Sequence, residues 1–103
     1  MQPINVSDLF KIKCPGLDED IQEYLEEDYS AEKLIEALIS PIIAIFATDD
    51  GEFSISGFKT IEDLNKDVKT CIQENHGWYL EYLFVSGKMV EFDMKVSIEI
   101  KDE

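Results

Sequence analysis

The sequence predicts an α+β fold: two N-terminal helices, then two strands, a long helix and two more strands, with a four-stranded antiparallel sheet packed on the long helix. Apolar residues recur at helical spacing in 17–39 and again in 61–72. Residues 42–57 and 78–100 instead hold strand-like apolar runs separated by glycine-containing turns. At 103 residues, the chain is expected to form one domain, residues 1–103.

The N-terminal region starts with a segment that allows two interpretations. Residues 4–12 fit either a short helix capped by Ser7 or a strand, and the Cys-Pro-Gly sequence at 14–16 indicates a turn without assigning a role to its cysteine. Two amphipathic helices are predicted next, over 17–28 and 31–39, the second with a serine N-cap and a proline after its end. Their apolar stripes are Leu17, Ile21, Tyr24 and Leu25, then Leu34, Ile35, Leu38 and Ile39.

The first pair of strands is predicted as a hairpin. Residues 42–47 are apolar on both alternating faces, which is typical of a strand covered on both sides. Asp50-Gly51 is expected to supply the positive φ angles of a tight turn. The returning strand, 52–57, alternates between apolar and polar residues, which predicts one buried face.

The long helix is predicted over 60–75. Thr60 and Asp63 have the spacing of a capping box, and Gly77 fits the left-handed residue that ends a helix. The buried stripe should contain Ile61, Leu64, Val68, Cys71 and Ile72.

Two more strands, 78–85 and 90–100, are predicted after the helix, joined by a turn at Ser-Gly-Lys. Doubly covered strands belong in the centre of a sheet, so the predicted order is 52–57, 42–47, 78–85, 90–100, that is, 2-1-3-4. Strict alternation puts Tyr79, Leu83 and Val85 on one face of 78–85 and Trp78, Leu80, Tyr82 and Phe84 on the other.

The face of the sheet opposite the long helix also needs a cover. Either the N-terminal helices fold over it, with Tyr79, Leu83 and Val85 beneath them, or two copies of the chain pack sheet against sheet. We favour the first, because both helices have an apolar stripe to bury. Acids and Lys on the two edge strands are typical of protection against edge-to-edge pairing.

The charge composition excludes several classes of function. The net charge is −14, from 23 acids and 9 bases, and every base is Lys. Binding of nucleic acid or of an anionic membrane requires a basic surface, so neither is expected. The start of the chain has no signal-peptide pattern and no segment has the length of an apolar transmembrane helix, so we expect a cytoplasmic protein with reduced cysteines.

Catalytic and metal-binding signals are weak. His76 stands at a predicted helix end, with no Ser or Cys placed beside it as a nucleophile. One His and two separated Cys do not predict a zinc site, and the acids at 18–28 have helical spacing where an EF-hand needs alternating ligands and a central glycine. We therefore expect no enzymatic activity, no metal and no cofactor. An acid–base enzyme would need a pocket that holds a carboxylate of raised pKa.

The segment 17–30 carries seven carboxylates and no base. If its apolar stripe lies on the sheet, the acids form a ridge that attracts a basic protein surface. The last three acids of the helix oppose the helix dipole, which a basic partner would relieve. The residues predicted to bind such a partner are Asp18, Asp20, Glu23, Tyr24, Glu26, Glu27, Asp28 and Trp78.

In size and charge, the chain resembles bacterial toxin-immunity proteins and DNA-mimic inhibitors; this resemblance rests on composition alone. It implies a non-enzymatic inhibitor that occupies the basic surface of a nuclease or DNA-binding protein. The alternative is a dimeric structural or accessory domain in which the charge serves solubility. The oligomeric state, monomer or homodimer, is left open.

Overall fold

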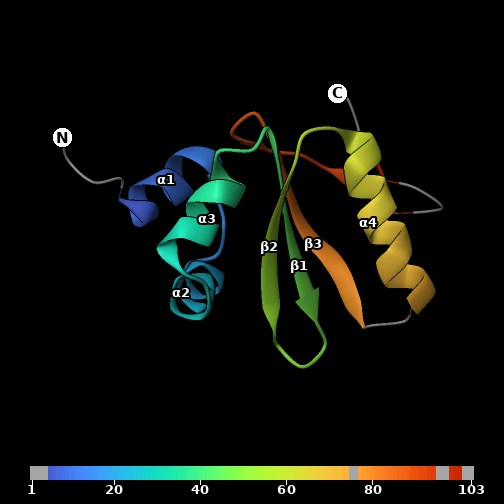
Figure 1. The fold of residues 1–103 in the computed structure, drawn as a ribbon, viewed down its shortest axis with the longest axis horizontal. Helices are drawn as coiled ribbons and strands as arrows, with labels where there is room; N and C mark the ends of the chain where they lie inside the picture. Colours follow the sequence, from blue (N-terminus) through green and yellow to red (C-terminus); the bar gives the residue numbers. More distant parts are fainter. Residues whose placement is uncertain (1–4, 75–76, 95–97, 101–103) are drawn as a thin grey trace.

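Three layers make up the part of the chain that the computed structural model describes, residues 5–74, 77–94 and 98–100. Helices α1, α2 and α3 lie on one side of the central sheet, and α4 lies on the other (Figure 1). The helices are α1 Val6–Lys13, α2 Glu19–Asp28, α3 Ala31–Leu38 and α4 Ile61–Glu74. The strands are β1 Ile42–Thr48, β2 Phe53–Phe58, β3 Trp78–Val85, β4 Lys88–Met89, β5 Phe92–Met94 and β6 Ile98–Ile100.

The predicted α+β class is confirmed, but three helices, not two, precede the strands in the described residues. The ambiguous N-terminal segment forms α1. The cap is Asn5, whose side-chain oxygen accepts hydrogen bonds from the backbone N–H groups of Ser7 (2.9 Å) and Asp8 (3.4 Å). Ser7 therefore lies inside the helix and not at its cap. Among the described residues, no helix combines the length and apolarity that crossing a membrane requires.

The sheet order β2-β1-β3-β4 is the predicted order, with each neighbouring pair antiparallel. β1 lies in the centre and is buried on both faces, as its sequence predicts. Its Ile43 and Ile45 side chains join the core under α1, α2 and α3, while Ala44 and Phe46 join the core under α4. The N-terminal helices thus cover the face for which packing against a second copy was the alternative.

The turn between β1 and β2 differs in detail from the prediction. Gly51 has a φ of 86°, but Asp50 does not adopt a positive φ. The Gly51 N–H donates to the Thr48 carbonyl oxygen (3.1 Å), and the Glu52 N–H donates to Thr48 Oγ1 (3.1 Å). This is a longer hairpin loop that ends in one left-handed glycine, a common alternative to the two-residue turn.

A bulge in β3 corrects the predicted faces of that strand. Ile45 of β1 is paired with Tyr82, but the next residue, Phe46, is paired with Leu80, so Glu81 has no partner on β1. One extra residue reverses the alternation of every side chain beyond it. Leu83 and Val85 consequently pack on the α4 side, not under the N-terminal helices, and Phe84 takes the place predicted for them.

The predicted strand 90–100 is wrong as a single element. The fourth position of the sheet is taken by the two residues of β4, and the chain then forms a separate two-stranded sheet, β5–β6. In this sheet Phe92 pairs with Ile100 and Met94 pairs with Ile98. The residues between the two strands, 95–97, lie outside the described part of the chain.

The long helix α4 begins as predicted. Its cap is Thr60, whose Oγ1 accepts from the Asp63 N–H at 3.1 Å, and Leu64 and Val68 are buried against the sheet. Gly77 has the left-handed φ of 78° that was expected after the helix. The predicted burial of Cys71 and Ile72 and the role of His76 concern side chains outside the described part of the structure.

Candidate partner-binding surface

The packing of α2 decides where its acids lie. Leu17, Ile21 and Leu25 are buried in the core formed with α1, α3 and the sheet. Leu17 precedes the helix, and Ile21 and Leu25 lie about one turn apart on one stripe of it, so the acidic positions around them face outward. Asp18 is the N-cap, and its Oδ1 accepts a hydrogen bond from the Asp20 N–H at 2.8 Å.

Among the residues predicted to bind a partner, five acids are exposed and Glu26 is half-buried. No carboxylate of α2 forms an ion pair with another described residue. The last turn of α2 contains no basic residue. The negative end of the helix dipole and the terminal acids therefore reinforce each other, and the field they produce is left for solvent or for a partner. The exposed acids are Asp18, Asp20, Glu23, Glu27 and Asp28.

Tyr24 connects α2 to the β1–β2 hairpin. Its ring is half-buried and meets the ring of Phe53 edge-on, with 5.4 Å between the ring centroids and an interplanar angle of 77°. Phe53 is the first residue of β2, directly after the hairpin turn. The contact holds the turn, with its exposed Asp49, Asp50 and Glu52, at the same end of the molecule as α2 (Figure 1).

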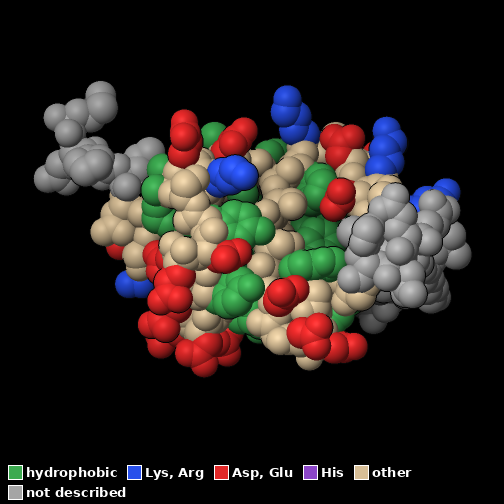
Figure 2. All heavy atoms as spheres, turned by 60° about the horizontal axis from the view of Figure 1, so that its bottom comes forward, with side chains coloured by type: hydrophobic (Ala, Val, Ile, Leu, Met, Phe, Trp, Pro, Cys, Tyr) green, Lys and Arg blue, Asp and Glu red, His purple; other side chains and the backbone are tan. Residues whose placement is uncertain are grey.

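Two sequence segments thus form one acidic surface. Figure 2 shows acidic side chains grouped over α2 and around the hairpin, with hydrophobic side chains between the two groups. The α2 acids follow from the helical pattern of the sequence, whereas the place of the hairpin acids depends on which face of β2 meets α2. The acidic surface consists of Asp18, Asp20, Glu23, Glu26, Glu27, Asp28, Asp49, Asp50 and Glu52.

The aromatic contribution differs from the sequence prediction. Trp78 is half-buried against the core on the α4 side, so the structure does not bring its side chain to the face that carries α2. Tyr79 follows it in β3 and therefore points to the opposite face. It pairs with Ala47, which in turn pairs with Phe53, so Tyr79 and Phe53 lie in one row across the sheet. Tyr79 has 40% of its surface exposed. It is therefore the residue of β3 that offers an aromatic ring to solvent beside the acidic surface.

The described residues contain no group of three or more His, Cys, Asp or Glu side chains arranged to hold a metal ion. Cys14, at the end of α1, is only 2% exposed, and burial raises the pKa of its thiol from 9.0 to about 12. A thiol that remains protonated at neutral pH is a poor nucleophile, so Cys14 acts as a core residue.

Comparison of the chain with protein-family models, with curated proteins and with solved structures gave no significant match.

Proposed function

We propose that this protein is a non-catalytic binding protein that docks on a basic surface of another protein through its acidic surface. One observation carries the proposal: acids from α2 and from the β1–β2 hairpin, more than twenty positions apart in the sequence, lie at one end of the molecule. Neither segment contributes a compensating base, since residues 14–32 and 34–58 contain no Lys or Arg.

The electrostatic contribution would act mainly on the rate of association. Carboxylates in water attract a basic partner over about one Debye length, roughly 8–10 Å at physiological salt, and steering of this kind raises association rates by about 10–10³-fold. The gain is lost at high salt, which gives the proposal a measurable signature.

Aromatic side chains beside the acids would supply contact area. Tyr24 is half-buried and Tyr79 is 40% exposed, so each ring keeps surface that a partner can cover. Tyrosine is enriched among residues that dominate binding energy, because a rigid ring buries much area at little entropic cost. Trp78, which faces the α4 side, is replaced by Tyr79 in this proposal.

The chemistry of the surface favours a partner that itself binds phosphates. A nuclease or a DNA-binding protein presents Lys and Arg side chains to phosphates, and the carboxylates of the acidic surface could pair with them. This corresponds to an inhibitor, an immunity-like protein or a DNA mimic. The alternative is that the acids serve only solubility, and the following experiment distinguishes the two.

The proposal is tested by a pull-down from a lysate of the source organism at low and at moderate salt, using wild type and an amide variant. The variant is Glu23→Gln, Glu27→Gln and Asp28→Asn, because all three side chains are exposed. We expect wild type to capture a basic protein at low salt, with loss of capture both at moderate salt and in the variant.

A matched control removes the same charge elsewhere. Glu62→Gln, Asp67→Asn and Glu91→Gln neutralise three exposed acids outside the acidic surface. This control should capture the partner as wild type does. Equal loss in both variants would mean that only net charge matters, and equal capture by all three proteins would contradict a binding role for α2.

A further inference from the structure

Strand β2 forms an edge of the described sheet, with β1 on one side and no strand on the other. The Thr48 N–H donates to the Glu52 carbonyl oxygen, and antiparallel pairs alternate between hydrogen-bonded and non-hydrogen-bonded along the strand. By that alternation, the backbone groups of Ser54 and Ser56 point to β1. Those of Ile55 and Gly57 point outward, where another extended chain could reach them.

The sequence of β2 does little to prevent such pairing. Edge strands are usually protected by a charge, a proline or a bulge within the strand. The residues Phe53–Phe58 include none of these, and the pairing of β2 with β1 is regular throughout. The acid expected within this strand, Glu52, precedes it in the structure, and Lys59 follows it, so neither charge interrupts it.

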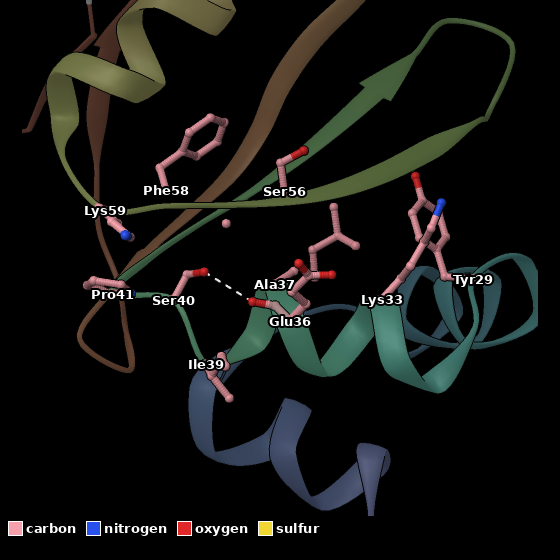
Figure 3. Close-up of a pocket in the computed structure, with 12 residues that line it drawn as sticks. Tyr29, Lys33, Glu36, Ala37, Ile39, Ser40, Pro41, Ser56, Phe58 and Lys59 are labelled. Carbon is pink, nitrogen blue, oxygen red and sulfur yellow. Dashed lines mark hydrogen bonds between the residues drawn. The ribbon is translucent and has the colours of Figure 1, made fainter.

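Helix α3 turns this edge into a groove of about 800 Å³ between the helix and β2 (Figure 3). The end of the helix is held close to the strand: a Cβ at Gly57 would lie 2.8 Å from the Ala37 carbonyl oxygen. Ser40, which follows the helix, is fixed by a hydrogen bond from its hydroxyl to the Glu36 carbonyl oxygen at 3.2 Å. An added strand would therefore have β2 on one side and α3 along its length.

The charges in the groove indicate what kind of segment fits. Lys33 and Lys59 are the two bases between residues 14 and 65, and both line the groove together with one exposed acid, Glu36. Figure 3 shows Lys33 beside Tyr29 at one end and Lys59 beside Pro41 at the other. On the β2 side, the lining runs from Ile55 to Lys59, which is four steps of extended chain or about 13 Å.

We propose that the groove binds an extended peptide segment of a partner protein, which adds to β2 as a strand and carries two carboxylates about four residues apart. Strand addition of this kind takes its affinity from main-chain hydrogen bonds and its specificity from alternate side chains. A second copy of this chain fits less well, because its own edge strand, Phe53–Phe58, carries no carboxylate to meet Lys33 and Lys59.

The first test measures binding of the labelled peptide acetyl-Glu-Thr-Val-Thr-Glu-amide to the full chain by fluorescence anisotropy. Replacing Lys33 and Lys59 with Glu should weaken binding by about tenfold, because two attractive charge pairs at the surface become repulsive. The control, Lys66→Glu with Lys69→Glu on α4, makes the same change of charge away from the groove and should leave affinity within about twofold.

The second test locates the bound peptide by amide hydrogen exchange. Saturating peptide should slow exchange at Ile55 and Gly57, whose N–H groups face outward, and should change Ser54 and Ser56 little, because β1 already protects them. A peptide N-methylated at its central valine should bind more weakly.

Three outcomes would overturn the proposal. They are no binding at millimolar peptide, equal loss in the groove and control variants, or bound peptide with no added protection at Ile55 and Gly57. Concentration-dependent dimerisation that protects the same two amides would assign the edge to a second copy instead.

Discussion

At the scale of single residues, Gly57 is the glycine that leaves the least room for a side chain. A Cβ there would lie 2.6 Å from the Ser40 Cβ and 2.8 Å from the Ala37 carbonyl oxygen. Backbone cannot yield as the end of a flexible side chain can, so Gly57→Ala should lower the free energy of unfolding by about 1–3 kcal/mol. Urea denaturation measures the loss.

The neighbouring Ser56→Ala, at a half-buried position of the same strand, is the matched control and should stay within about 0.5 kcal/mol of wild type. Adding Ser40→Gly to Gly57→Ala should recover part of the loss, since it removes one of the two obstacles. If Gly57→Ala unfolds at the same urea concentration as wild type, α3 does not approach β2 this closely.

Cys14 gives a prediction for alkaline pH. Burial raises its pKa from 9.0 to about 12, so between these values the folded protein keeps a proton that the unfolded chain releases. The contribution of Cys14 to stability is complete below pH 9 and falls as pH rises toward 12, by up to about 1.4 kcal/mol per pH unit. The stability difference between wild type and Cys14→Ala should accordingly shrink from pH 8 to pH 10.

Urea unfolding of both proteins at the two pH values checks this, and the comparison removes the titration of Lys and Tyr, which the two proteins share. A difference that stays constant would mean that the thiol is not protected by burial. In the native state at pH 8, a thiol reagent should modify Cys14 only as fast as the core opens.

At the scale of elements, hydrophobic periodicity predicted the helices and the central strands, and it failed where a single residue changes the register. The bulge at Glu81 leaves no mark in the sequence, because a charged residue between two apolar ones reads as ordinary alternation. The strand predicted over 90–100 failed for a related reason. Three residues separate Met94 from Ile98, its partner, so the apolar alternation continues unbroken through the hairpin.

In helix α2, the terminal acids proposed to bind a partner also lower the stability of the helix. Asp28 is exposed in the last turn, where a negative charge meets the negative end of the helix dipole. Asp28→Lys should raise the free energy of unfolding by about 0.3–1 kcal/mol, measured by urea denaturation, and should at the same time weaken capture of a basic partner. Glu19→Lys in the first turn is the opposite control and should be destabilising by a similar amount.

If the Asp28→Lys variant is more stable and still binds normally, the end of α2 does not belong to the binding surface. One that gains no stability would mean that the terminal charge is already offset in the native protein.

At the scale of the whole molecule, a net charge of −14 opposes the compact state and, in our proposal, attracts the partner. Added salt should therefore have opposite effects on the two. Raising salt from low to moderate concentration should increase stability by about 1 kcal/mol, or about 4–8 °C in melting temperature, while it weakens binding. Parallel melting and pull-down series measure both, and loss of stability in the same salt range would contradict the argument.

The candidate site could be predicted in part. The apolar stripe of α2 predicts that its acids face outward, and they do so in the structure. The hairpin acids could be seen in the sequence, but their place beside α2 depends on the contact between Tyr24 and Phe53, which joins segments nearly thirty residues apart. Tyr79 was missed because strict alternation assigned it to a covered face, whereas the start of β3 extends beyond the helices that cover the rest.

The central position of β1 has a consequence during synthesis of the protein. Its apolar core, Ile42–Ala47, carries no charge, and its pairing with β2 completes only one of its two edges. The other edge stays unpaired until β3 leaves the ribosome, and this happens only after all of α4 has been made. A nascent chain that ends near Phe58 thus presents a bare, apolar strand to its neighbours, the kind of surface that chaperones bind and that aggregates when they are scarce.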